Sequence, residues 1–217
     1  MKCAAIIVAA GSSRRMGFDK LMHPLAGKAV LQHSLDAFQN NPAISKVVVV
    51  TSLHRFELLD TRAHVESVEG GAERHLSVMA GLNCLHPEIE LVAVHDGARP
   101  LISAEQIEKV TTAAKEHGAA SSAKHITDTV KRSTAEHFTH SSISRENLWA
   151  METPQVFHKS HITSAYEHVI RENLLVTDEV SALEHLSLPT KLIYNTTPNP
   201  TITFPEDIQL AETLSAL

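Results

Sequence analysis

Short apolar runs that alternate with amphipathic segments constrain the fold more than any other feature of this sequence. Residues 3–9, 46–51 and 91–95 are mostly apolar and lack the polar alternation of a strand that faces water on one side. Between such runs lie segments with apolar residues at helical spacing, such as Leu31 and Leu35. The sequence therefore predicts an α/β fold with a largely parallel sheet, flanked by helices and joined by right-handed crossovers.

Further elements follow from the same patterns. We expect helices over 30–38, 56–62, 73–85, 103–117, 162–170, 178–185 and 205–216, and strands over 64–68, 119–124 and 191–194. Ser103 stands three residues before Gln106 as an N-cap, and Pro205 occupies a first helical position. Because ligands bind such sheets beyond the carboxyl ends of the strands, functional residues are expected in the loops that follow them.

The segment 127–148 breaks this alternation. It is polar, with isolated apolar residues at Val130, Phe138 and Ile143. Its composition favours a hairpin or arm that projects from a single domain spanning residues 1–217. A disordered loop is the alternative.

Composition excludes several classes of protein. The chain has 19 Lys and Arg against 25 Asp and Glu, a net charge of -6, so it lacks the basic field that holds nucleic acid. No apolar run approaches the ~20 residues that a bilayer crossing needs, and no secretory cleavage site follows the first apolar run. Two distant cysteines, Cys3 and Cys84, argue against a disulfide framework. We therefore expect a cytoplasmic protein with neither nucleic-acid nor membrane partners.

The 15 histidines raise the question of a metal site. Two pairs are spaced i, i+3, His137 with His140 and His158 with His161, and neither lies in an H-E-x-x-H pattern. Because a zinc site needs three or four convergent ligands, a surface origin is favoured over a metal site.

The loop after the first strand carries the strongest local signal of function. Gly11 and Ser12 allow the backbone to approach a phosphate closely, and Arg14, Arg15 and Lys20 add three positive charges. The loop lacks both the G-K-[ST] ending of a Walker A motif and the G-x-G-x-x-G of dinucleotide folds. Basic residues in place of glycines suggest that it neutralises a triphosphate. An ordinary polar connection between strand and helix is the alternative.

Two further loops are expected at the same edge of the sheet. Asp96 follows a core strand, and a carboxylate beside a polyphosphate must meet a ribose hydroxyl or a Mg²⁺ ion. Asp96 is therefore either related to the nucleotide or a loop cap. Residues 69–74, with Gly70 and Gly71, form a second loop suited to close contact with a base.

These motifs together resemble the 2-C-methyl-D-erythritol 4-phosphate cytidylyltransferase family, within the broader Rossmann-like nucleotidyltransferases. Their order and spacing along nearly the whole chain make the resemblance specific. It covers residues 9–16, 70–77, 94–100, 128–131, 148–149, 153–155, 177–179, 182–184, 203 and 205–207.

The resemblance implies a role for each matching residue. Arg15 and Lys20 would stabilise charge on the CTP phosphates, and Mg²⁺ would be the cofactor, with Asp96 as its ligand. The nucleotide pocket would contain Ala10, Gly11, Ser12, Gly71, Ser77, Asp96 and Gly97, of which Gly71 and Ser77 would read cytosine. The substrates would be CTP and a polyol phosphate, the latter bound by Thr129, Lys131, Arg145, Thr153, Thr177 and Thr201. The family's arm crosses a homodimer interface, so Thr129 and Arg145 would serve the partner's site.

Two departures from the family pattern stand out. Asp19-Lys20-Leu21 replaces Pro-Lys-Gln after a shortened loop, and Thr201 replaces a lysine that would hold the substrate phosphate. Lys131, Arg132 or Lys191 could compensate for that lysine. A cytidylyltransferase for another polyol phosphate, such as ribitol 5-phosphate, and a non-catalytic nucleotide-binding protein of the same fold are the alternatives. An NAD-dependent oxidoreductase is disfavoured by the missing glycine fingerprint.

Overall fold

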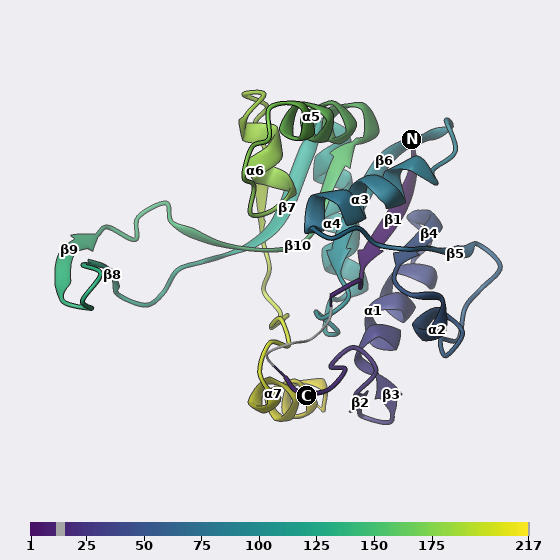
Figure 1. The fold of residues 1–217 in the computed structure, drawn as a ribbon, viewed down its shortest axis with the longest axis horizontal. Coiled ribbons are helices and arrows are strands. Elements are labelled where there is room, and N and C mark those ends of the chain that lie inside the picture. The colour runs from purple at the N-terminus through teal and green to yellow at the C-terminus, as the bar shows by residue number, and fades with distance from the viewer. Residues whose placement is uncertain (12–15, 217) are drawn as a thin grey trace.

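A computed structural model of the chain describes residues 1–11 and 16–216. Within these residues, seven strands form one sheet in the order β11-β7-β10-β6-β1-β4-β5 (Figure 1). The strands are β1 (Lys2–Val8), β4 (Ile44–Val50), β5 (Val65–Val68), β6 (Ile89–Asp96), β7 (Ala119–His125), β10 (Trp149–His158) and β11 (Lys191–Tyr194). Only β10 runs antiparallel to its neighbours in this described part of the sheet, which confirms the predicted α/β fold with a largely parallel sheet.

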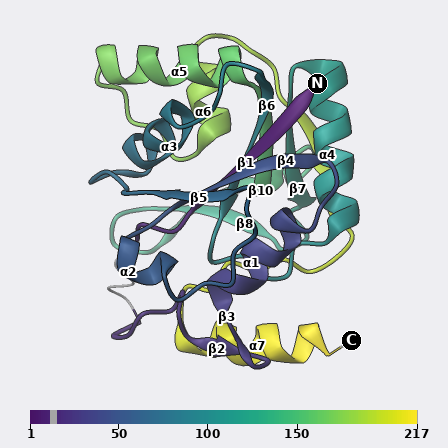
Figure 2. The same cartoon turned by 90° about the vertical axis from the view of Figure 1, so that its right-hand side faces the viewer.

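Helices cover both faces of the sheet (Figure 2). One face packs against α1 (Val30–Gln39) and α4 (Ala104–His117), and the other against α3 (Arg74–Asn83), α5 (Lys159–Arg171) and α6 (Glu179–Glu184). Strands buried on both faces explain the continuous apolar runs of the sequence. As predicted, Ser103 caps α4 by accepting a hydrogen bond from the backbone N–H of Gln106. Gly118 ends the helix with a left-handed φ of 84°.

Strand β10 was not predicted from the sequence, in which residues 153–155 matched only a family motif. Proline cannot donate to a sheet ladder, so Pro154 argues against a central strand. In the structure the pairing of β10 with β7 is interrupted between Met151 and Gln155, and Pro154 lies inside that interruption. The strand therefore accommodates a proline at the centre of the sheet.

The predicted helix over 56–62 was wrong. The structure has a short helix, α2 (Leu53–Phe56), because Ser52 accepts a hydrogen bond from the backbone N–H of Arg55 and caps an earlier start. Two small strands, β2 (Pro24–Leu25) and β3 (Lys28–Ala29), were also not predicted. Helix α7 (Pro205–Ser215) begins at Pro205, as expected, and packs near β2 and β3 (Figure 1).

The arm predicted over 127–148 is a hairpin and not a disordered loop. It contains β8 (Val130–Ser133) and β9 (Thr139–Ile143), which pair with each other, and it extends away from the sheet between β7 and β10 (Figure 1). Rings of His125, Trp149 and Tyr194 gather at its base, with the first two centroids 3.7 Å apart. None of the helices within the described residues has the length and apolar character to cross a bilayer.

Candidate active site

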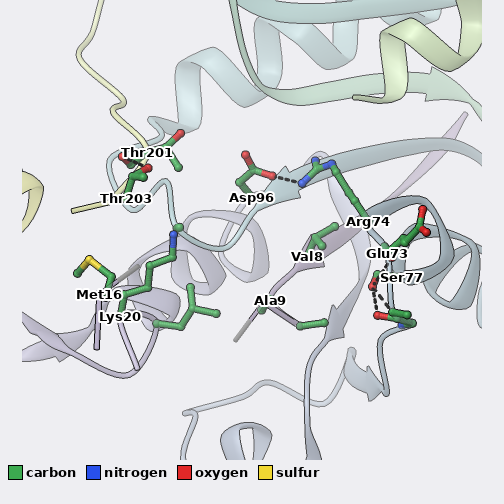
Figure 3. A pocket seen from close by; sticks show the side chains of 16 residues that line it. Val8, Ala9, Met16, Lys20, Glu73, Arg74, Ser77, Asp96, Thr201 and Thr203 are labelled. Carbon is green, nitrogen blue, oxygen red and sulfur yellow. Dashed lines mark hydrogen bonds and ion pairs between the residues drawn. The ribbon is translucent and has the colours of Figure 1, made fainter. Parts of the chain in front are cut away.

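A cavity of about 740 Å³ lies at the carboxyl ends of β1 and β6, beside the start of α3 (Figure 3). The structure brings seven of the predicted site residues to its wall: Ala10, Gly11, Lys20, Gly71, Ser77, Asp96 and Thr201. Arg15 and Ser12, as well as Arg14, lie outside the described residues. The cavity stands where the parallel-sheet rule expects a ligand.

Glycines allow the loops around the cavity to pack closely. A Cβ on Gly70 would lie 2.3 Å from the Cβ of Ala10, and one on Gly97 would lie 2.8 Å from Leu31 Cδ1. Gly97 is buried beneath the cavity rather than in its lining, and its backbone N–H donates to Val8 O. These positions therefore need glycine for space and not for an unusual φ.

Ser77 shapes the second glycine loop. Its hydroxyl oxygen accepts a hydrogen bond from the N–H of Gly71 at 3.1 Å, and it lies 3.2 Å from the carbonyl of Glu73, to which it can donate. Ser77 is buried while Gly71 is exposed at the cavity. The pair predicted to read a base thus consists of an accessible backbone segment and the side chain that holds it.

Arg74 links the cavity to the buried side of α6. Its Nη1 lies 2.5 Å from Asp96 Oδ1 (Figure 3). On its other side, Nε lies 3.0 Å from Oε1 of Glu179 and Nη2 lies 3.0 Å from Oε2. Glu179 is fully buried and also accepts a hydrogen bond from the hydroxyl of Tyr166 at 3.0 Å. Arg74 is therefore the bridge that connects two carboxylates across the start of α3.

The charges of this network are mutually stabilised. Burial would raise the pKa of Asp96, but Arg74, with Arg99, outweighs it and holds that pKa below its ordinary value. Burial would likewise lower the pKa of Arg74, yet Glu179 and Asp96 raise it above its ordinary value. Asp96 therefore presents an ionised carboxylate to the cavity at neutral pH.

Lys20 lies on the opposite side of the cavity from this network (Figure 3). Its Nζ donates to the carbonyl of Ile202 at 2.5 Å, between Thr201 and Thr203 in the chain, and both threonines line the cavity. The ammonium thus lies against the segment in which Thr201 replaces the family lysine.

Thr153 lies behind Asp96 and not in the cavity wall. Its hydroxyl oxygen accepts a hydrogen bond from the Asp96 N–H at 3.0 Å and lies 3.0 Å from Nδ1 of the fully buried His95. Nε2 of His95 lies 3.1 Å from the carbonyl of Arg99, so Nε2 carries the proton and Nδ1 accepts from Thr153. In this chain Thr153 therefore positions Asp96, and its contact with substrate stays a prediction.

The other predicted substrate residues are not part of this chain's cavity lining. Thr129, Lys131 and Arg145 are exposed on the arm, where Lys131 donates to the Ser142 hydroxyl and Arg145 to the carbonyl of Thr127. Thr177 is exposed ahead of α6 and donates its N–H to Ser181.

The proposed substitutes for the missing lysine can also be located. Lys191 begins β11 and pairs with Ala120, three residues before the carboxyl end of its strand, so it does not stand at the cavity edge. Arg132 lies with Lys131 on the exposed arm.

Comparison with known proteins decides the family. The family model described as IspD, 2-C-methyl-D-erythritol 4-phosphate cytidylyltransferase, matches residues 3–216. The chain belongs to this family. It is 38% identical to the 2-C-methyl-D-erythritol 4-phosphate cytidylyltransferase of Pelotomaculum thermopropionicum, over 97% of this chain and 93% of that protein.

Solved structures of the cytidylyltransferase family share the fold. The 4-diphosphocytidyl-2C-methyl-D-erythritol synthase of Anaerococcus prevotii superposes with a TM-score of 0.89 at 28% identity, over 100% of this chain and 96% of that one. The 2-C-methyl-D-erythritol 4-phosphate cytidylyltransferase of Francisella tularensis gives a TM-score of 0.87 at 28% identity, over 99% and 100%.

Several residues of this cytidylyltransferase site were missed by sequence reasoning. Arg74 appeared only as the end of a glycine loop, Glu179 only within a family motif, and Arg99 only after Asp96. Arg99 donates to the carbonyl of Asn199 at 2.8 Å and lies 3.6 Å from Asp96 Oδ2. The available signal was a charged residue within a motif, but the sequence does not show which residue it pairs with. For Arg74, that partner is Glu179, 105 residues away.

The site fits a magnesium ion that takes one carboxylate from the protein and its other ligands from phosphates and water. Within residues 1–11 and 16–216, no group of three or more His, Cys, Asp or Glu side chains is arranged to hold a metal. His137 and His140 are exposed, while His158 and His161 stack on each other with centroids 5.2 Å apart. Mg²⁺ in phosphate-transfer sites often takes only one or two carboxylates and completes its shell with phosphates and water. The ionised Asp96 could be such a carboxylate.

Proposed function

We propose that this protein transfers CMP from CTP to 2-C-methyl-D-erythritol 4-phosphate and releases pyrophosphate, in non-mevalonate isoprenoid precursor synthesis. The product would be 4-diphosphocytidyl-2-C-methyl-D-erythritol. The observation that carries the proposal is the cavity in which Lys20, the glycine loops and the ionised Asp96 meet, in a chain of the cytidylyltransferase family.

The chemistry needs charge neutralisation more than a protein base. A phosphate monoester has its second pKa near ~6 and is already an anionic nucleophile. Its oxygen forms a bond to the α-phosphorus of CTP, while the bond from that phosphorus to the oxygen shared with the β-phosphorus breaks. Lys20 and Arg15 would hold the triphosphate in line and cancel the negative charge that develops on it.

Magnesium is the proposed cofactor. When bound it would neutralise part of the negative charge on the phosphates. Asp96, whose carboxylate faces the cavity, would be its protein ligand. Arg74 would keep this carboxylate ionised and fixed in direction.

The polyol phosphate would be bound by residues of two chains in a cytoplasmic homodimer. Thr129, Lys131 and Arg145 would come from the partner's arm, and Thr153, Thr177 and Thr201 from the chain that holds CTP. An isolated two-stranded hairpin is marginal in water, so the exposed arm supports the idea of a partner surface on which it packs.

A second candidate is a cytidylyltransferase for another polyol phosphate, such as ribitol 5-phosphate. The observation that favours it is Thr201, which lines the cavity where the family has a lysine. Losing a charge-assisted contact costs about 1.5–3 kcal/mol and would change which phosphate ester binds best.

Pyrophosphate release with CTP, Mg²⁺ and a panel of polyol phosphates tests both candidates. We expect release with 2-C-methyl-D-erythritol 4-phosphate and little with ribitol 5-phosphate, and loss of activity when Mg²⁺ is chelated. Faster release with ribitol 5-phosphate would replace the first candidate with the second. CTP binding without release for any polyol phosphate would point to a non-catalytic nucleotide-binding protein.

A further inference from the structure

We propose that Arg55 and Asp19 form a clamp that positions Lys20 in the active site. Neither residue lines the cavity, and neither has a role in the reaction derived above. The inference rests on the proposed role of Lys20 and adds a positioning residue to it. Asp19 is also where this chain departs from the family's Pro-Lys-Gln pattern.

The guanidinium of Arg55 contacts both ends of the loop that follows β1. At the start of the loop, its Nη1 donates to the carbonyl of Ala9 at 2.8 Å and its Nη2 to that of Gly11 at 3.2 Å. At the end of the loop, its Nε donates to Asp19 Oδ2 at 2.7 Å. A single side chain therefore ties together two points of the chain that are eight residues apart or more.

Asp19 transmits this anchor to Lys20. Its second oxygen, Oδ1, accepts a hydrogen bond from the N–H of Leu21 at 3.1 Å. Leu21 is buried in the core, and its carbonyl accepts from the N–H of Leu31 at 2.9 Å. The backbone of Lys20 is thus fixed on both sides, by the clamp before it and by the core after it, while its ammonium reaches Ile202.

Arg55 is itself held in a defined place. It belongs to the short helix α2, whose cap Ser52 accepts from the Arg55 N–H at 3.4 Å, and its side chain is only 15% exposed. The preceding Thr51 donates its hydroxyl to the same Ala9 carbonyl at 3.3 Å. The end of β4 and the end of β1 are therefore joined at the point from which Arg55 extends.

The geometry requires an arginine. A guanidinium presents several N–H groups in a rigid planar fork, and here three nitrogens face three separate acceptors. A lysine ammonium keeps the charge but cannot span acceptors placed around a plane. Arg55→Lys therefore separates the shape of the clamp from its charge.

The test compares pyrophosphate release by variants of the full-length protein with CTP and 2-C-methyl-D-erythritol 4-phosphate. Because a small misplacement of a catalytic group can cost about 100-fold, we expect Arg55→Ala to lower kcat about 10- to 100-fold. The KM for the polyol phosphate should change by less than about twofold. Arg55→Lys should recover only part of the loss, and Asp19→Asn should lose less than Arg55→Ala because it keeps the contact to Leu21. Lys109→Ala, which breaks an exposed ion pair with Glu105 on α4, is the matched control and should match the wild type.

The decisive comparison places Arg55→Ala in a Lys20→Ala background. If Arg55 acts through Lys20, the double variant should be no slower than Lys20→Ala alone, because residues that act as a unit are not additive. A further loss of the same size as in the wild-type background would overturn the inference. A wild-type kcat in Arg55→Ala would also overturn the inference. If Arg55→Ala does not fold, a wild-type kcat in both Arg55→Lys and Asp19→Asn would overturn it instead.

These outcomes separate the clamp from the proposed function. Wild-type kcat in the Arg55 and Asp19 variants, with a kcat of Lys20→Ala that is lowered by orders of magnitude, would reject the clamp and leave the proposed function intact. Full activity in Lys20→Ala would remove Lys20 from the mechanism and reject the clamp with it. A wild-type protein that releases no pyrophosphate would reject the proposed function itself.

Discussion

Arg74 Nη1 lies 2.5 Å from Asp96 Oδ1, so the carboxylate that faces the cavity is held by the arginine that begins α3. The same guanidinium makes a paired contact with Glu179, which is completely buried. Asp96 is therefore oriented by a charge whose own position is set in the core. Oδ1 of Asp96 is thus fixed by Arg74, while Oδ2 lies 3.6 Å from Nε of Arg99.

Removing Arg74 should destabilise the protein strongly. Arg74→Ala leaves the buried Glu179 without its cation, and breaking such a pair from one side costs about 3–5 kcal/mol. Urea unfolding of the wild type and the variant measures the loss. The double variant Arg74→Ala/Glu179→Gln should regain part of it, since the buried charge is then absent. A double variant that is less stable than Arg74→Ala would contradict this account.

The hydroxyl of Ser77 should matter for CTP affinity more than for turnover. Ser77→Ala removes the hydrogen bond that holds Gly71, which is worth about 1 kcal/mol, and should raise the KM for CTP roughly fivefold. Steady-state kinetics with varied CTP give the value. Ser45→Ala is the matched control, because Ser45 also donates to a backbone carbonyl, that of Cys3, at the far end of β1. An equal change in both variants would argue against a specific role for Ser77.

Protonation of His95 should limit stability in mild acid. Burial lowers the pKa of His95 to about 4, against the opposing effect of Asp96. The unfolded chain takes up this proton near pH 6.5 and the folded chain only near pH 4, so stability falls as the pH is lowered through that window. The contribution is at most about 3 kcal/mol.

Unfolding midpoints at a series of pH values test this dependence. His95→Gln should flatten the slope between pH 6.5 and 4, whereas His140→Gln, on the exposed arm, should leave it unchanged. An unaltered slope in His95→Gln would assign the acid sensitivity to other groups.

Shared sites in a dimer predict complementation between two impaired variants. Lys20→Ala and Arg145→Ala should each keep only a small residual activity alone. In mixed dimers one of the two sites would combine an intact Lys20 with an intact Arg145, so equal mixing of a two-fold dimer should restore roughly a quarter of wild-type activity. The mixture is assayed after conditions that exchange subunits. No recovery despite demonstrated exchange would exclude sites built from two chains.

Restoring a lysine at position 201 should strengthen binding of the polyol phosphate. Thr201 lines the cavity, next to the carbonyl that holds Lys20. A new charge-assisted contact of about 1.5 kcal/mol should lower the KM for that substrate roughly tenfold. Thr213→Lys, on the exposed side of α7, controls for added charge. An unchanged or higher KM in Thr201→Lys would mean that the substrate phosphate lies elsewhere.

Much of the fold could be predicted because it depends on local patterns. Continuous apolar runs mark strands covered on both faces, and Ser103 and Pro205 mark helix starts through hydrogen bonds and dihedral angles within a few residues. Strand β10 escaped because Pro154 contradicts the local rule, while its place in the sheet depends on pairing with β6 and β7.

The sequence predicted those residues of the site that lie within recognisable local motifs. Lys20, Gly71 and Asp96 lie in recognisable loops after strands, and these loops meet at one edge of the sheet. The bridge from Arg74 to Glu179 joins positions 105 residues apart, and the contact of Arg55 with Asp19 joins positions 36 apart. Such pairs form through tertiary packing, which local sequence patterns do not reveal.

Strand β10 runs from the base of the arm to the residue behind Asp96. Trp149, at its start, contacts the ring of His125 where the arm leaves the body, and Thr153, four residues later, holds the backbone of Asp96. The base of the arm and the hydroxyl that holds the Asp96 backbone therefore belong to one strand, although the pairing of that strand with β7 is interrupted between Met151 and Gln155. The hairpin and the wall of the cavity are thus joined through a few residues of a single strand.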